Sequence, residues 1–150
     1  MTKNLFLLAL LLVSQNSFAD LIAANQYHCT AKNITVDYSS SSFIGQPQIN
    51  IMIGKKGYGA MGSDLIQNQA TVLGNLITIT KNAKPDLYTD SLTVLLPDVN
   101  VNALGESVSF KSQLLVTRTA TSIGGPALVN GVIQSNSAKT LECTATAVLF

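Results

Sequence analysis

Residues 48–53 read QINIMI, and the four residues after them, 54–57, read GKKG. Isoleucine occupies every second position of the first stretch, and this period of two is typical of a β-strand with one buried face. The glycines and lysines that follow predict a tight turn. Strand and turn signals of this kind continue in both directions along the chain, which predicts an all-β protein.

Outward from this stretch, apolar residues alternate with Ser, Thr, Asn and Gln over most of the chain. Further strands are expected at residues 27–38, 72–80, 88–96, 108–117, 128–134 and 141–149. In the first of these the apolar set changes parity, from Tyr27 and Cys29 to Ile34. We interpret this change as a one-residue β-bulge near residues 32–33.

The connections between these strands predict how the strands pair. Parallel sheets need crossover helices, and the sequence predicts at most one short helix, over residues 63–69 with Ser63 as its N-cap. The expected fold is therefore an antiparallel β-sandwich or small barrel of seven to eight strands.

The composition limits the size and the partners of the domain. The chain has 150 residues, which is enough for one domain, and 11% of them are charged against about a quarter in ordinary soluble proteins. Nine basic residues face eight acidic ones, so there is no basic surface for nucleic acid. We expect no nucleic-acid partner.

The first nineteen residues have the three parts of a secretory signal peptide. Lys3 gives a positive start, residues 5–13 are uninterruptedly apolar, and residues 17–19 read SFA before Asp20. Nine apolar residues are too few for a transmembrane helix. We expect cleavage between Ala19 and Asp20 and export of residues 20–150 to the periplasm or the extracellular space, in a style that looks bacterial.

The two cysteines, Cys29 and Cys143, both lie in the expected mature domain. Disulfides persist in oxidising compartments, so export favours a bond between them that links the first and last strands. His28 stands beside Cys29, but zinc needs three or four ligands and the chain has one histidine. Neighbouring residues on a strand also point to opposite faces, which disfavours a thiol nucleophile with His28 as its base.

Residues Gly57–Gly62 match the pattern G-x-G-x-x-G that cradles dinucleotides. That fingerprint also needs a helix after the third glycine and an acidic residue about twenty positions later. Residues 79–83 read ITKNA and contain no acid. We therefore expect a hairpin here, and no cofactor.

Asp98, Asn100 and Asn102 reproduce the D-x-N-x-N opening of a calcium loop. The sixth position of such a loop should be glycine and the twelfth glutamate, whereas the chain has Ala103 and Ser109 there. Alternation along an edge strand explains the same pattern. These three residues are candidates for a weak calcium site only.

The sequence offers no supported catalytic constellation. Glycoside hydrolysis needs two flanking carboxylates, and the close-set pairs are Asp86 with Asp90 and Asp98 with Glu106. A serine hydrolase would show G-x-S-x-G or a well-placed histidine, and the motif is absent.

We expect an exported, non-catalytic binding module whose ligand is a protein, a glycan or a small apolar molecule. The main alternative is a pilus-like or surface-assembly subunit, because the chain is small, low in charge and rich in Ser, Thr and Asn. A small secreted hydrolase and an outer-membrane barrel are further alternatives. The strand edges lack the charges that usually prevent association, so they are expected either to be closed or to bind.

Overall fold

The computed structural model describes residues 23–42, 44–63, 65–84, 88–99, 104–120 and 133–149. The expected signal peptide, its cleavage site at Ala19 and Asp20, and most of the strand expected at 128–134 lie outside these ranges. In the described ranges all regular structure is β, which confirms the predicted class.

Nine strands form one antiparallel sheet with the order β4-β3-β2-β1-β9-β8-β7-β6-β5. Their bounds are β1 (Ala23–Ala31), β2 (Ile34–Ser39), β3 (Gln48–Ile53), β4 (Lys56–Met61), β5 (Ile66–Thr71), β6 (Gly74–Lys84), β7 (Tyr88–Leu96), β8 (Ser107–Ala120) and β9 (Ile133–Leu149).

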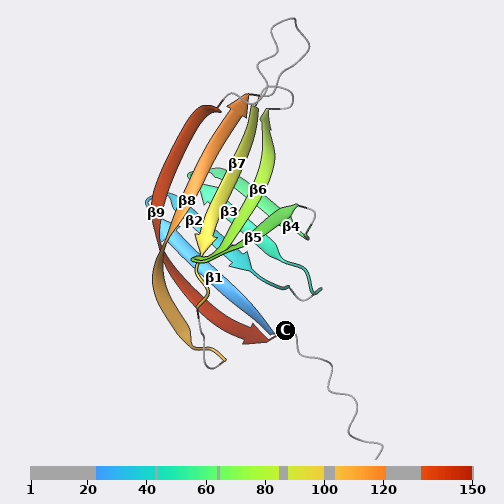
Figure 1. Ribbon diagram of the computed structural model, residues 1–150, viewed down its shortest axis with the longest axis vertical. Helices are drawn as coiled ribbons and strands as arrows, with labels where there is room; N and C mark the ends of the chain where they lie inside the picture. The colour runs from blue at the N-terminus through green and yellow to red at the C-terminus, as the bar shows by residue number, and fades with distance from the viewer. Residues whose placement is uncertain are drawn as a thin grey trace, which may run out of the picture.

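The long strands β8 and β9 join the two halves of the sheet (Figure 1). The C-terminal half of β9 pairs with β1 on one side and with the start of β8 on the other. The end of β8 pairs with β7, from Leu114 opposite Val94 to Ala120 opposite Tyr88. Buried Ser112 adds a hydrogen bond from its hydroxyl to the carbonyl of Leu95, beyond the last of these pairs.

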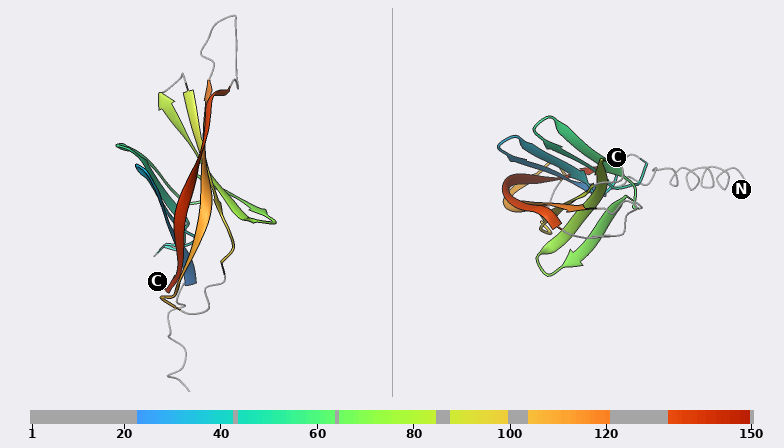
Figure 2. Two further views of the ribbon diagram at one scale, coloured as in Figure 1. Left: turned by 90° about the vertical axis from the view of Figure 1, so that its left-hand side faces the viewer. Right: turned by 90° about the horizontal axis from the view of Figure 1, so that it is seen from above.

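The sheet curls into a half-barrel. Seen from above, the hairpins β1–β2 and β3–β4 form one arm and β5–β6 the other, joined through β8 and β9 (Figure 2). The two ends of the sheet, β4 and β5, follow one another in the chain but do not pair. The predicted antiparallel all-β class is therefore confirmed. The described strands number nine, not seven to eight, and they form a single curled sheet instead of a sandwich or a closed barrel.

The core lies on the inner face of this curl. Its buried members come from all nine strands, and they are Tyr27, Cys29, Ile34, Val36, Tyr38, Ile49, Ile51, Tyr58, Ile66, Ile77, Ile79, Leu92, Val94, Leu96, Leu114, Leu141, Cys143 and Ala145. The strands β1, β2, β3, β6, β7 and β9 contribute alternate residues and the other three contribute one each, so the period-two pattern of the sequence corresponds to inner and outer faces.

The change of parity near residues 32–33 is a hairpin turn and not a β-bulge. β1 and β2 pair from Ala31 opposite Ile34 to Gln26 opposite Ser39. Asn33 has a φ of 60°, a left-handed conformation that asparagine tolerates in tight turns. The chain reverses there, so residues of opposite parity come to lie on the same face.

The expected helix at residues 63–69 is wrong, because residues 66–71 form β5. Ile66 is buried in the core, and β5 pairs with β6 along its whole length. Residues 72–73, expected to begin a strand, form the turn between these two strands. Ser63 is a favourable N-cap residue, but burial of Ile66 and cross-strand pairing with β6 stabilise a strand here instead of a helix.

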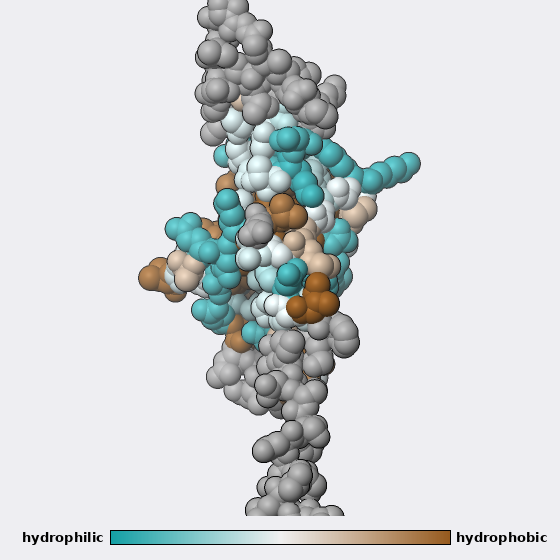
Figure 3. All heavy atoms as spheres, turned by 90° about the vertical axis from the view of Figure 1, so that its right-hand side faces the viewer, coloured by the Kyte–Doolittle hydropathy of each residue, from teal (hydrophilic) through white to brown (hydrophobic). Residues whose placement is uncertain are grey.

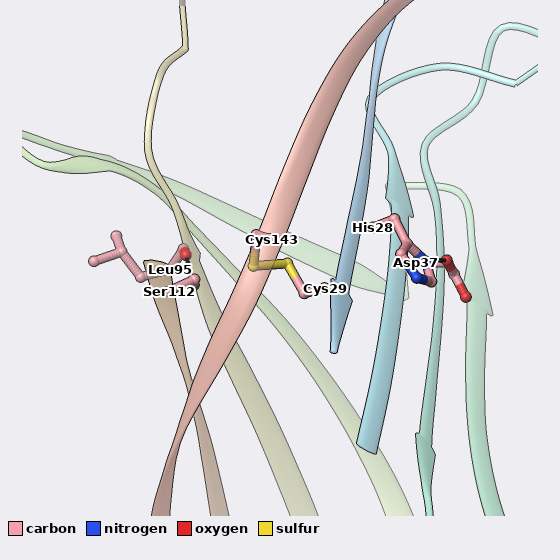
Figure 4. Close-up of a disulfide and its surroundings, with 6 residues drawn as sticks. All are labelled: His28, Cys29, Asp37, Leu95, Ser112 and Cys143. Carbon is pink, nitrogen blue, oxygen red and sulfur yellow. Dashed lines mark hydrogen bonds and ion pairs between the residues drawn. A yellow bond between two sulfur atoms is a disulfide. The ribbon is translucent and has the colours of Figure 1, made fainter. Parts of the chain in front are cut away.

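The disulfide between Cys29 and Cys143 is present and links β1 to β9, as predicted (Figure 4). The two residues lie directly opposite one another in the register, with their Cα atoms 4.0 Å apart. They are 114 positions apart in sequence, so the bond ties the first described strand of the chain to the last, and these two strands are neighbours in the middle of the sheet.

Candidate functional site

The outer face of strands β9, β1, β2, β3 and β4 carries two adjacent rows of residues that run across the strands. In each row neighbours lie directly opposite one another, which aligns their side chains on one face. The first row is Thr144, His28, Asp37, Asn50 and Gly59, and the second is Thr146, Gln26, Ser39, Gln48 and Met61.

All ten residues of these rows line a single pocket of about 720 Å³, which we call the outer trough. Leu65, which follows β4, also lines it. Four steps between strands at about 4.8 Å each make the trough about 19 Å long. Its volume lies within the range of small-molecule sites, roughly 300 to 1,000 Å³.

The two rows are polar and carry few charges, but the outer trough as a whole has more apolar than polar surface, and Tyr27, Tyr38, Ile49 and Ala60 also line it. The side chains of the rows are mainly hydroxyls and carboxamides, which can both donate and accept hydrogen bonds. Ser39 is an exception, because it is buried and its hydroxyl donates to the carbonyl of Ser41. Gly59 has no side chain, and an added Cβ would meet only the Ile49 carbonyl at 3.9 Å, so this position forms an open part of the floor.

His28 and Asp37 are joined by a hydrogen bond in the trough. His28 Nδ1 donates to Asp37 Oδ1 over 2.6 Å, and Figure 4 shows the two side chains together, apart from the disulfide. The bond fixes the orientation of the imidazole, and both side chains stay about half exposed. Thr144 lies opposite His28 in the register, but within the described ranges the ring bonds only to Asp37.

The sequence pattern around Cys29 drew attention to His28 as a neighbour of the cysteine, whereas Asp37 was not predicted as its partner. The signal was present, because positions 28 and 37 lie at equal distances from the turn at residues 32–33. A β-bulge at residues 32–33 would leave residues 27–38 as one strand, in which positions 28 and 37 are far apart. The hairpin turn places them opposite one another.

A second polar cluster lies inside the curl around Asp90, whose side chain is almost fully buried. Arg118 donates to both carboxylate oxygens, from Nε to Oδ1 over 2.7 Å and from Nη2 to Oδ2 over 2.9 Å. Lys56 Nζ and the Tyr58 hydroxyl also donate to Oδ2, over 3.1 Å and 3.2 Å. Lys56 and Tyr58 belong to β4, Asp90 to β7 and Arg118 to β8, so this cluster fastens the sheet end at β4 to β7 and β8 across the curl.

The environment of Asp90 explains its acidity. Hydrogen bonds from Arg118 first, and from Lys56 in addition, outweigh the effect of burial and lower the pKa of the carboxyl from 3.8 to about 2. The pKa of Lys56 is raised, chiefly by its interaction with Tyr58, and Asp90 adds to the effect. The ring of Tyr58 also lies 4.8 Å from the Lys56 amine. Because every partner is satisfied, we interpret the cluster as structural.

Of the three calcium candidates, the structure describes Asp98 alone. Asp98 accepts a hydrogen bond from the Asn75 carboxamide over 2.7 Å, while Asn100 and Asn102 lie outside the described residues. In the part of the chain that the structure describes, no group of three metal-ligating side chains occurs. Residues 57–61 of the glycine motif belong to the edge strand β4.

The described residues contain no helix long and apolar enough to cross a membrane. The chain matches no protein-family model and shows no significant similarity to any curated protein or solved structure.

Proposed function

We propose that the protein is an exported, non-catalytic binding module that holds a neutral carbohydrate in the outer trough. The observation that carries this proposal is the pair of cross-strand rows, which presents hydroxyl and carboxamide groups at regular spacing along one pocket.

The charge of the trough favours a neutral ligand. Among the side chains that line the trough, Asp37 is the acidic one and already accepts a hydrogen bond from His28, so few charged groups face a ligand. Carboxamides and hydroxyls match the mixed donors and acceptors of sugar hydroxyls. Of the ligand classes considered from the sequence, we favour a glycan, because the two rows offer hydrogen-bonding groups in succession and the apolar part of the lining can pack against the C–H faces of sugars.

The shape of the trough favours a chain-like ligand. It is about 19 Å long and crosses five strands, so an oligosaccharide can contact several hydrogen-bonding positions in succession. Met61 and Leu65 supply an exposed apolar surface at one end, where the C–H face of a sugar can pack.

Export is supported by the signal-peptide pattern of residues 1–19 and by the disulfide between Cys29 and Cys143. Such bonds persist mainly in oxidising compartments, where cell-surface and secreted glycans also occur.

Filling the floor of the trough tests this proposal. Gly59→Thr places a side chain on the outer face of β4 without a backbone clash and should reduce glycan binding at least tenfold by occupying the trough. Gly57→Thr is the matched control, because Gly57 lies on the same strand and face but outside the trough. Its new Cβ would approach only the flexible Met52 side chain, at 3.1 Å from Sδ.

The measurement is binding of the oxidised protein to an array of neutral oligosaccharides, with circular dichroism of each variant to confirm its fold. Loss of binding in Gly59→Thr with retention in Gly57→Thr supports the trough. If the wild type binds no neutral glycan, or if both variants bind as it does, the proposal fails.

A surface-assembly subunit is a second candidate, and one observation favours it. Among the described strands, β4 and β5 each pair on one side only, so the sheet has two open edges. Such a subunit would form an open series of oligomers, which mass measurement in solution distinguishes from a discrete species.

A further inference from the structure

A row of polar residues crosses the inner face of the sheet at one end of the curl. Lys81 of β6 lies opposite Asp90, Asp90 lies opposite Arg118, and Arg118 lies opposite Ser135 of β9. Residues directly opposite one another point to the same face, and Asp90 is on the inner face, so all four side chains lie there. Lys56 reaches the same place from β4, across the curl.

The N-terminal half of β9 extends this row along the strand. Ser137 lies opposite Val116, and Lys139 lies opposite the core residue Leu114, so both also face inward. Ser135, Ser137 and Lys139 are exposed, and β1 pairs only with the C-terminal half of β9. We call this surface the inner ledge, and its members are Lys56, Lys81, Arg118, Ser135, Ser137 and Lys139.

The inner ledge carries more positive charge than the nearby acid neutralises. Four of its members are cationic, and in the described part of the chain Asp90 is the one carboxylate in these rows. Among the ion pairs of the described residues, none involves Lys81 or Lys139. Residues 121–132, between β8 and β9, contain no acid. Since the whole chain is nearly neutral, this excess of positive charge is local.

Arg118 keeps donors that Asp90 does not use. Its Nε and Nη2 donate to Asp90, whereas within the described ranges its Nη1 makes no hydrogen bond. The side chain is 39% exposed, and its guanidinium lies 5.6 Å from the centre of the Tyr88 ring. The carboxylate and the ring thus hold the guanidinium in one orientation, with donors available to a further anion.

The position of the inner ledge limits which anions can reach it. It lies inside the curl and faces the arm formed by β1–β4 (Figure 2), where a flat membrane surface does not fit. From Ser135 to Lys139 it is about 14 Å long, and four cations are few for a nucleic-acid duplex. In Figure 3, strongly hydrophilic side chains stand out from the upper part of the described surface, the end at which β6–β9 meet in Figure 1.

We infer that the inner ledge binds an acidic polysaccharide of the uronic-acid type. Each sugar of such a chain carries hydroxyls as well as a carboxylate. The carboxylates are complementary to Arg118 and the lysines, and the sugar hydroxyls can bond to Ser135 and Ser137, which lie between the cations along β9. An acidic peptide offers the carboxylates but not the hydroxyls. The inner ledge and the outer trough lie on opposite faces of the sheet, so this site is additional to the proposed one.

Calorimetry with oligogalacturonate tests the inference, with its neutral methyl ester as the matched ligand. The oxidised wild type should bind the acid form at least about tenfold more tightly than the ester. The binding should weaken between about 0.01 M and about 0.1 M salt, because the screening length falls from about 30 Å to about 10 Å. Joint replacement Lys81→Gln and Lys139→Gln should weaken binding at least about tenfold. Neither lysine donates to Asp90, so circular dichroism should show an unchanged fold.

Lys111→Gln is the matched control for Lys139→Gln. Both lysines are exposed on the β8–β9 pair, but Lys111 lies opposite Glu142 on the outer face. The control should bind oligogalacturonate as the wild type does. Absence of binding, equal binding of the methyl ester, full affinity in the double variant, or an equal loss in Lys111→Gln would each overturn the inference. Equally tight binding of poly-glutamate would assign the ledge to an acidic peptide instead.

The outcome is distinguishable from that of the outer trough. Gly59→Thr fills the outer trough and should leave oligogalacturonate binding unchanged. A loss of that binding in Gly59→Thr would place the acidic chain in the outer trough and overturn the inference. Failure of neutral glycans to bind would contradict the proposed function without affecting the result for the inner ledge.

Discussion

Asp90 shows how a single buried residue holds the curled sheet closed. Its carboxylate accepts from Arg118, Lys56 and Tyr58, which bring β8, β4 and β7 together. A buried carboxylate without such partners would be strongly destabilising, whereas one with four donors stabilises its folded, charged form.

The acidity of Asp90 predicts a pH dependence of stability. The folded-state pKa of about 2 lies below the ordinary value of 3.8, so the unfolded chain binds this proton more readily. The stabilisation, about 2 kcal/mol, is complete above about pH 4 and is lost as the pH falls through about 2. Asp90→Asn removes it and should lower the free energy of unfolding at neutral pH by about 3 kcal/mol.

Urea unfolding of the wild type and Asp90→Asn at about pH 5 and about pH 2 checks this prediction. The difference in unfolding free energy between the two proteins should shrink by about 2 kcal/mol at the lower pH. A difference that stays constant would show that the carboxylate charge does not stabilise the fold.

For individual residues, the sequence indicated which apolar side chains are buried but not which polar side chains form hydrogen bonds with one another. Asp90 was noted only as a member of a carboxylate pair with Asp86, because its partners lie 28 to 34 positions away. Contacts of that range depend on the curl of the sheet, which local patterns do not contain.

Hairpins are the elements from which this fold is built, and the outcome of the sequence analysis depended on recognising their turns. The turn at residues 54–57 was predicted, and it joins β3 to β4 at Gly54 and Lys55. The turns at residues 32–33 and 72–73 were missed, because Lys-Asn and Val-Leu are weaker turn signals than glycine pairs.

Two glycines at hairpin ends have different roles. Gly74 has a φ of 128°, and an added Cβ would lie 2.5 Å from the Leu96 carbonyl oxygen and from Pro97 Cα. Gly54 has a φ of 61° with open space around it. Gly74→Ala should therefore destabilise by more than about 2 kcal/mol, whereas Gly54→Ala should cost about 1 kcal/mol from the backbone conformation alone.

Thermal or urea unfolding of these two variants, side by side, measures the contrast. If the two substitutions cost the same, the close approach of β6 to the chain after β7 is not a constraint on the fold.

For the whole molecule, the sequence predicted the all-β class, the antiparallel pairing and the disulfide. The parities of Cys29 and Cys143 placed both on the core side, and the register sets them opposite one another. The number of strands and the single curled sheet were not predicted, because they depend on how β8 and β9 are shared between the two arms.

The candidate site could not be predicted from the sequence either. Its ten row members come from five strands that span residues 26 to 146, and their alignment requires four registers at once. What the sequence did contain was the uncharged polar face, rich in Ser, Thr, Asn and Gln, which the structure gathers into the outer trough.

The most direct test of this account is to map a bound glycan onto the backbone. Amide NMR shifts should be followed while the neutral oligosaccharide that binds best on the array is added to the oxidised protein. We predict the largest changes at His28, Asp37, Asn50, Gly59 and Thr144, which form one row across the trough. Changes centred on β5 and β6, or no saturable change at all, would contradict the assignment of the outer trough as the binding site.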